Sequence, residues 1–286
     1  MKKILVPTDF SDCSRNAFKA AMQIAEKTNA VVELVHVYDR PVIGFVDLNI
    51  DHKKNKTVLI KTQHAMETMV ESMKLENSVV NTHILADIPL TEILDQRIFK
   101  DVDMMVMGSQ GSEGIRELFI GSNTEKVVRK SKIPILSLKE DIDVFDLKNI
   151  VVASNFYKEL EGVFEQINNF LNIFNPHFNL LKVVTPGNFE TSHYSRKIMQ
   201  GFADNFGMKN YSIHIYNDNS IEAGILNFAK DIEADAIVIA THGRKGIEHF
   251  INGSLAEDVV NHAFTPVLSF KLKEGKKNDN VLFPAV

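Results

Sequence analysis

The sequence predicts an α/β protein made of two similar units in tandem, each an open five-stranded parallel sheet flanked by helices. Short β-branched runs alternate with amphipathic stretches along the chain, a pattern typical of βαβ units around a parallel sheet. This pattern occurs twice, and the length of 286 residues suits two units of roughly 140 residues each. A hydrophobic content of 44% gives each unit enough apolar surface for a core.

Five strands are expected in each half. In the first half they are expected at Lys3–Pro7, Val31–Val37, Val79–Leu85, Asp103–Gly108 and Pro134–Leu138. In the second half they are expected at Asn149–Ala153, Phe178–Val184, Tyr211–Tyr216, Ala236–Thr241 and Pro266–Phe270. The apolar runs 4–6 and 150–152 are continuous rather than alternating, which indicates strands that are covered on both faces.

The duplication is visible as two constant shifts in numbering. Adding 132 superposes the segment 103–137 on 235–269, whereas the first strands align at a shift of 146, so that Asp9 falls on Asn155. The two shifts differ by 14 residues, which we place around Asp39–Thr57 as a longer excursion between the second strand and the second helix.

The acidic, poorly periodic stretch 139–148 is expected to connect the two units. We therefore place one domain at 1–139 and the other at 148–271. The remaining residues, 272–286, are rich in lysine and asparagine and are expected to form a mobile tail.

Composition argues against several classes of function. The net charge is −5 and the basic residues are spread along the chain, which does not suit nucleic-acid binding. No apolar run approaches the roughly 20 residues of a membrane span, and the start does not resemble a signal peptide. Together with the single cysteine, Cys13, this predicts a cytoplasmic protein without a membrane association.

A glycine-rich segment leaves the fourth strand of the first half and enters a helix. Gly108 and Gly111 let the chain turn off the strand without a side chain in the way. Gly121, Ser122 and Asn123 open the next helix with unpaired N–H groups. A helix N-terminus at the carboxyl end of a parallel strand favours phosphate, so the segment predicts an anion-binding site.

The first strand of the same half ends in Pro7-Thr8-Asp9, beside the predicted anion site. A carboxylate at this point can accept hydrogen bonds from ribose or adenine. The alternative is that Asp9 or Ser11 only caps the first helix and that the glycines serve ordinary turns. The presence of both elements in one half favours a nucleotide.

The spacing Gly108-x2-Gly111-x9-Gly121-Ser122 resembles the signature of the ATP-binding branch of the universal stress proteins. Pro7-Thr8-Asp9 is similar to that family's first-strand adenosine contact, and the likeness covers nearly the whole chain, twice. The resemblance implies a Rossmann-like, adenine nucleotide alpha hydrolase-like fold with strand order 3-2-1-4-5 in each unit. It also implies that ATP lies across the first and fourth strands.

The resemblance further implies the site residues. They are Pro7, Thr8, Asp9, Val37, Met107, Gly108, Gly111, Gly121, Ser122 and Asn123. The aspartate would meet adenosine, the valine would offer backbone groups to adenine, Met107 and Gly108 would line the sugar side, and the last four would hold the phosphates. The implied cofactor is ATP or another adenine nucleotide, with or without Mg. The last strands, 133–138 and 266–270, would pair as an intrachain pseudo-dimer, and a homodimer stays open.

The second half departs from the signature. Ala240 stands in place of the first glycine and Asn155 in place of the aspartate, so we expect a weak or empty second site. Arg244, Lys245 and His249 in its loop are either solvated surface charges or a source of residual anion affinity.

The expected function is a nucleotide-binding stress-response or regulatory module, not an enzyme. The chain has no Gly-Lys-Ser/Thr and no Gly-x-Ser-x-Gly, so any ATP hydrolysis should be very slow, and no metal site is expected. Two alternatives stay open: a non-catalytic interaction scaffold with a vestigial site, and an enzyme that acts on adenine nucleotides. The sequence does not name a protein partner.

Overall fold

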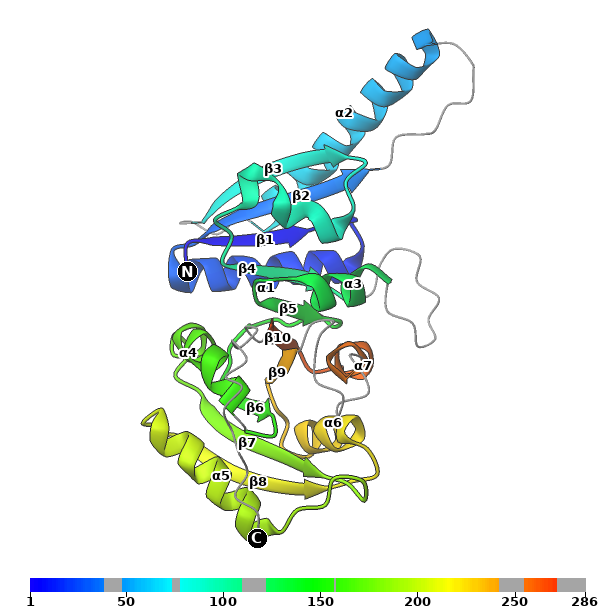
Figure 1. Ribbon diagram of the computed structural model, residues 1–286. Coiled ribbons are helices and arrows are strands. Elements are labelled where there is room, and N and C mark those ends of the chain that lie inside the picture. Colours follow the sequence, from blue (N-terminus) through cyan, green and yellow to red (C-terminus); the bar gives the residue numbers. More distant parts are fainter. Residues whose placement is uncertain (39–47, 74–77, 110–121, 157, 242–254, 272–286) are drawn as a thin grey trace.

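The computed structural model describes residues 1–38, 48–73, 78–109, 122–156, 158–241 and 255–271 of the chain, and for 48–55, 122–123, 158–163 and 241 it describes the backbone only. These residues form one ten-stranded sheet with helices on both faces (Figure 1).

The elements follow one another in the predicted alternation. In the first half they are β1 (Lys3–Pro7), α1 (Asp12–Thr28), β2 (Val31–Tyr38), α2 (Leu48–Ser72), β3 (Val79–Ala86), the 3-10 helices η1 (Leu90–Asp95) and η2 (Arg97–Phe99), β4 (Met104–Gly108), α3 (Ser122–Lys130) and β5 (Ile135–Leu138). In the second half they are β6 (Asn149–Ala153), α4 (Lys158–Leu171), β7 (His177–Val184), α5 (Ser192–Asn205), β8 (Tyr211–Asn217), α6 (Ile221–Asp231), β9 (Ala236–Thr241), α7 (Leu255–His262) and β10 (Val267–Lys271). All ten predicted strands are confirmed, with ends that differ by one residue at most.

The strand order is β3-β2-β1-β4-β5-β10-β9-β6-β7-β8. Within each half the strands are parallel and follow the implied order 3-2-1-4-5. The two five-stranded parallel sheets are continuous with each other, because β5 and β10 pair antiparallel and join the two halves edge to edge. The implied pairing of the two last strands is thereby confirmed.

This junction has approximate twofold symmetry within one chain. Leu136 lies opposite Leu268, its equivalent at the shift of 132. Asn261 on α7 donates from Nδ2 to Glu125 Oε1 on α3 at 2.7 Å, and the equivalent pair across the axis is Arg129 with Glu257, at 3.7 Å. The surface formed by β5 and α3 therefore contacts the equivalent surface formed by β10 and α7, as in the isologous interface of a twofold dimer.

Other details are repeated between the halves. Asp103 accepts from the backbone N–H groups at the start of β1, and Asp235 does the same at the start of β6. Asn29 (φ 54°) follows α1 and Asn175 (φ 49°) follows α4, both in the left-handed region that asparagine tolerates. The duplication inferred from spacing thus extends to individual hydrogen bonds.

The described part of the predicted excursion over Asp39–Thr57, residues 48–57, is helical, which corrects the prediction there. Helix α2 has 25 residues against 14 in its counterpart α5, and it already begins at Leu48. Its outer part projects beyond the sheet (Figure 1). The segment contains no glycine or proline and forms a helix on propensity, but it has no sheet to cover and therefore carries no apolar periodicity.

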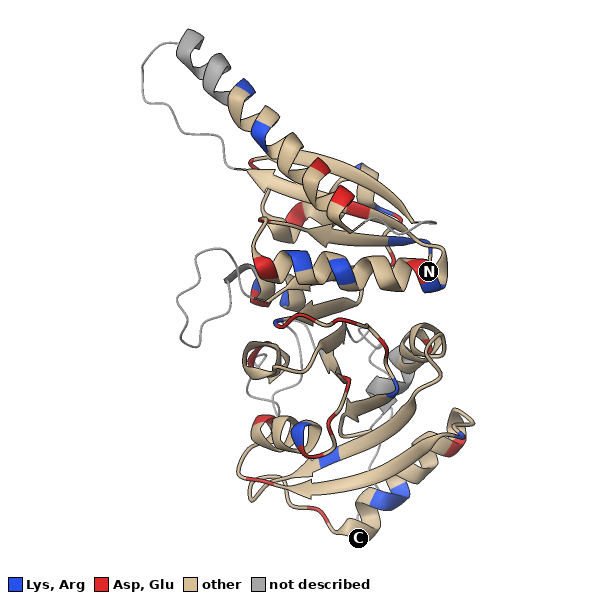
Figure 2. Ribbon diagram, turned by 180° about the vertical axis from the view of Figure 1, so that it is seen from behind, with Lys and Arg blue, Asp and Glu red and all other residues tan. Residues whose placement is uncertain are grey.

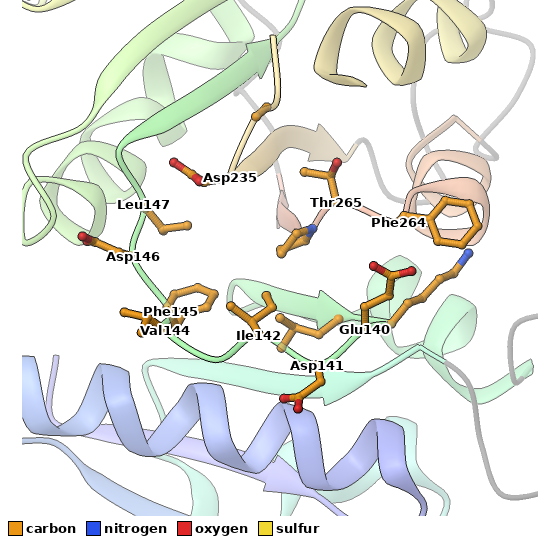
Figure 3. Close-up of a pocket in the computed structure, with 14 residues that line it drawn as sticks. Glu140, Asp141, Ile142, Val144, Phe145, Asp146, Leu147, Asp235, Phe264 and Thr265 are labelled. Carbon is orange, nitrogen blue, oxygen red and sulfur yellow. The ribbon is translucent and has the colours of Figure 1, made fainter. Parts of the chain in front are cut away.

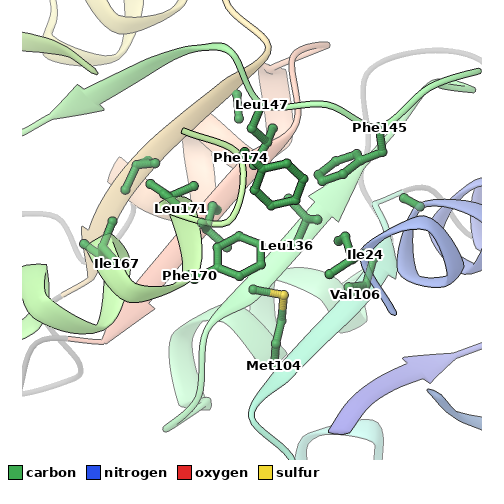
Figure 4. Close-up of a cluster of buried hydrophobic side chains, with 14 of the residues drawn as sticks. Ile24, Met104, Val106, Leu136, Phe145, Leu147, Ile167, Phe170, Leu171 and Phe174 are labelled. Carbon is green, nitrogen blue, oxygen red and sulfur yellow. The ribbon is translucent and has the colours of Figure 1, made fainter. Parts of the chain in front are cut away.

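Two apolar layers lie on the two faces of the sheet. Helices α1, α2, α4 and α5 contribute to one layer, and α3, α6, α7 and the 3-10 helices contribute to the other. At the junction the first layer is continuous between the halves: Leu136 and Phe145 belong to the same cluster as Phe170 and Phe174 (Figure 4). The Phe145 and Phe174 rings meet edge to face, 5.9 Å apart.

The acidic segment 139–148 lies along α1. Lys19 contacts Asp141 and Asp143 at 2.9 and 3.1 Å, and Lys27 contacts Asp146 at 3.1 Å. Figure 2 shows the acidic residues of this connector between α1 and the second half. Exposed pairs of this kind contribute little individually, so the buried Phe145 and Leu147 side chains provide most of the connector's attachment.

A histidine in the second half gives the fold a predicted pH dependence. His214 on β8 donates from Nε2 to Asn179 Oδ1 at 3.0 Å and packs on Phe228, with ring centroids 4.8 Å apart. Burial lowers the pKa of the His214 imidazole, and the positive groups of His177 and Arg196 lower it further.

Since the unfolded histidine titrates near pH 6.5, the unfolded chain takes up the His214 proton at a higher pH than the folded chain. The free energy of unfolding should therefore decrease as pH falls below about 6.5. We expect His214→Gln to flatten this decrease in urea titrations between pH 7 and 5. The exposed His193→Gln serves as control and should leave the wild-type slope. Equal slopes in all three proteins would contradict the assignment to His214.

Candidate functional site

Six of the predicted site residues meet where β1, β2 and β4 end. Strand β1 lies between β2 and β4, and the winding of the sheet reverses between β1 and β4. Pro7-Thr8-Asp9, Val37 and Met107-Gly108 therefore share the carboxyl edge of these strands, which we call the β1–β2–β4 edge. In open α/β sheets, ligands bind at such a switch point.

The other four predicted residues follow β4 in the chain. Gly111 and Gly121 lie outside the described residues. Ser122 and Asn123 form the first turn of α3, as predicted, and their side chains are not described.

The turn after β1 is stabilised by contacts with buried and half-buried side chains. Thr8 is buried, and its Oγ1 accepts from the Phe10 N–H at 3.0 Å and lies 3.0 Å from Ser14 Oγ. Phe10 has a φ of 64°, an uncommon conformation for a bulky residue. The Phe10 and His36 rings lie 4.7 Å apart, and His36 Nδ1 is 2.7 Å from the Thr8 carbonyl oxygen. The backbone of the predicted adenosine contact is thus fixed by side chains beneath it.

Asp9 is exposed at the top of this turn. Its Oδ1 accepts from the Ser11 N–H at 3.0 Å and from Ser11 Oγ at 2.5 Å. Ser11 in turn caps α1, since its side chain accepts from the Ser14 N–H at 3.3 Å. The alternative interpretation of Ser11 as a helix cap is therefore confirmed. The same contacts fix the carboxylate of Asp9 at the β1–β2–β4 edge, next to the N-terminus of α1.

Position 108 requires glycine for a different structural reason from the one that the sequence suggested. A Cβ added there would lie 2.7 Å from the carbonyl carbon of Cys13, 2.8 Å from its oxygen and 2.9 Å from its Cβ. The glycine therefore lets the first turn of α1 approach β4, rather than only easing the turn off the strand. Its carbonyl oxygen accepts from Thr124 Oγ1 at 3.2 Å, which connects the start of α3 to the same point.

The supporting role of His36 was not predicted from the sequence. The alternation in Val35-His36-Val37 places His36 on the sheet face opposite to its two neighbours. That alternation was the available signal, but it could not reveal that Phe10 folds back over the imidazole ring.

The second half keeps the turn and changes its polar groups. Ser154 replaces the threonine, with its Oγ accepting from the Phe156 N–H at 3.0 Å, and Phe156 has a φ of 61°. Lys182 occupies the place of the histidine, is 6% exposed, and contacts Glu190 at 2.5 Å. Asn155 and Ala240 take the places of the aspartate and the glycine. The predicted basic loop residues Arg244, Lys245 and His249 lie outside the described residues.

Over the described parts of the chain, no three or more His, Cys, Asp or Glu side chains gather as a metal ion would require. Among the same residues, no helix combines the length and the apolar character of a membrane span.

The sheet order, the crossover helices and the repeated turn define a class: a doubly wound α/β unit, present twice. The family model of the universal stress protein family matches residues 1–139 and 149–271, and the chain belongs to this family. The resemblance seen in the sequence is confirmed.

Several relatives show how the match extends. Universal stress protein MJ0531 of Methanocaldococcus jannaschii is 32% identical over 142 residues, which cover 49% of this chain and 82% of the relative. The universal stress protein E homolog of Haemophilus influenzae is 23% identical over 310 residues and covers 97% of this chain and 99% of its own. The crystal structure of a universal stress protein from Archaeoglobus fulgidus superposes with a TM-score of 0.71 at 20% identity, covering 95% of this chain and 97% of that chain. The two-unit fold therefore occurs in other members.

Proposed function

We propose that this universal stress protein is a stress-response or regulatory module whose first half binds an adenine nucleotide, ATP in the first instance. The proposal rests on a difference between the turn after β1 and the equivalent turn after β6. Both halves build the same turn after the first strand, but only the first half has a carboxylate on it and a glycine opposite. An identical scaffold with different polar groups indicates that the groups serve a ligand rather than the fold.

The surroundings of the β1–β2–β4 edge suit such a ligand. Helices α1 and α3 both begin there, and each presents the positive end of its dipole, which favours phosphate. The Asp9 carboxylate can accept hydrogen bonds from ribose or adenine donors. Since no carboxylate cluster of the described residues suits a metal, magnesium would be held mainly by phosphate oxygens and water.

Binding rather than turnover is the proposed activity. Asp9 is committed to the turn through Ser11, and His36 lies beneath the turn with Nδ1 at a backbone carbonyl. Neither group is placed to orient an attacking water. The enzyme alternative is tested by product analysis after prolonged incubation with ATP, where turnover near one per second would favour it.

We expect one tightly bound nucleotide per chain in calorimetric titration with ATP. Asp9→Asn, which copies the second half, should weaken binding about 10-fold or more, because hydrogen bonds to a charged group are worth roughly 1.5–3 kcal/mol. The amide oxygen can still accept from Ser11, so the melting temperature should change little.

Asn155→Asp is the matched control and should not create a tight second site, because Ala240 remains. Two tight nucleotides per chain, or unchanged affinity in Asp9→Asn, would contradict the proposal. Absence of saturable binding by ATP, ADP and AMP would favour the scaffold alternative.

A further inference from the structure

A pocket of about 320 Å³ lies at the junction of the two halves. Leu138 at the end of β5 and most of the connector 139–148 line one side, and the segments that precede β9 and β10 line the other. In Figure 3, Phe264 and Thr265 face the connector residues Ile142 and Glu140 across it. We call it the junction pocket. Its volume is at the lower end of the range of ligand pockets and can hold an aromatic side chain.

The rim of the junction pocket is unusually apolar for a surface. Val144 is 73% exposed and Phe264 is 70% exposed, and among large apolar residues of the described chain only Phe189, at 76%, is more exposed. Two such residues at the same pocket indicate a surface that binds another segment or molecule.

The chain itself supplies a segment of matching character. Fifteen residues, 272–286, follow β10 and lie outside the described residues. The first nine, 272–280, begin with Leu272 and are otherwise polar apart from one glycine; their charged residues are three lysines and two acids. The last six, Val281-Leu-Phe-Pro-Ala-Val286, are all apolar. A run of six apolar residues at a surface requires a partner to shield it.

The segment can reach the junction pocket. Residues 264–266 line the pocket and lead directly into β10, which ends five residues later at Lys271. A five-residue strand spans about 17 Å, whereas nine extended residues span about 30 Å. The polar stretch is therefore long enough to run back along β10 and deliver the apolar residues to the pocket. Its three lysines outnumber its two acids, Glu274 and Asp279, so the stretch carries a small positive charge that suits the acidic connector.

We propose that the junction pocket binds the C-terminal hexapeptide Val281–Val286 of the same chain. Phe283 fills the pocket beside Phe264 and Val144, and the lysines of 272–280 face the acidic connector. The hexapeptide thus seals the surface between the two halves.

Hydrogen exchange followed by mass spectrometry tests this on the full chain. In the wild type, the amides of 281–286 should exchange at least 10-fold more slowly than in a free peptide of the same sequence. Phe264→Ser and Val144→Ser should each return them to the free rate. Phe189→Ser, an equally exposed site outside the pocket, is the matched control and should leave the protection intact. All three positions are exposed, and equal melting temperatures would show that the variants are folded.

Exchange of 281–286 at the free rate in the wild type would overturn the proposal. Protection that survives both Phe264→Ser and Val144→Ser would also overturn it, since the hexapeptide would then bind elsewhere. Analytical sedimentation tests whether a second copy of the chain covers the pocket instead. A dimer that dissociates in Phe264→Ser but not in Phe283→Ser would assign the surface to that second copy.

Discussion

Replacing Gly108 by valine is expected to abolish nucleotide binding and to lower the free energy of unfolding by about 1–3 kcal/mol, the usual cost of overpacking. The new side chain would meet backbone atoms of Cys13, with Cβ distances from 2.7 Å, and backbone cannot move aside as a flexible side chain can. Helix α1 would have to shift away from β4, together with the capping turn that carries Asp9. Calorimetric titration and urea unfolding measure the two effects.

Ala240→Val places the same side chain at the equivalent position of the second half. It should leave nucleotide affinity unchanged, because that half lacks the aspartate. If Gly108→Val bound ATP as tightly as the wild type while folded, the β1–β2–β4 edge could not be the site.

Phe164→Ala is expected to cost about 3–5 kcal/mol of unfolding free energy, the range for removing a buried aromatic side chain. Phe164 is fully buried, and its ring centroid lies 4.7 Å from that of Phe206, 4.8 Å from that of Phe202 and 6.3 Å from that of Phe178. Urea unfolding followed by circular dichroism measures the loss.

Phe189→Ala removes an equally large side chain that is exposed, and should change stability by no more than about 0.5 kcal/mol. A loss below about 1 kcal/mol in Phe164→Ala would mean that the aromatic cluster of the second half is not packed as the structure shows.

The fold was predictable where local pattern decides it. Continuous apolar runs such as Ile4-Leu5-Val6 indicate strands buried on both faces, and the ten strands were predicted from short β-branched runs. The pairing of the two last strands was implied by the family resemblance, and the duplication places Leu136 opposite its equivalent Leu268 in that pair.

The predictions for α2 and Gly108 were wrong because the structure at these places depends on packing rather than on the local sequence pattern. The start of α2 was misjudged, because the exposed turn 56–61 leaves no periodic apolar signal. The requirement for glycine at position 108 comes from Cys13, which is far away in sequence. Contacts of this kind depend on how a helix packs on the sheet, and residue spacing does not record that.

The candidate site was predictable only in part, because its backbone positions follow from the strand order whereas its side-chain contacts do not. Six residues converge at the β1–β2–β4 edge, because the ends of neighbouring parallel strands must meet. The side chains beneath the turn, His36 and Phe10, were not predicted, since the left-handed conformation of Phe10 is what brings them together. The binding roles of all ten predicted site residues stay predictions.

The approximate twofold axis at β5 and β10 has a consequence for how the molecule can change. In a dimer of identical chains, one substitution alters both equivalent places, and dilution separates the partners. Here the partners are covalently joined, so their local concentration does not fall with dilution. Each side can also vary alone, as where Arg129 faces Glu257 while its equivalent Asn261 faces Glu125. A single chain therefore keeps the assembly of a pair while one half is free to lose a function that the other retains.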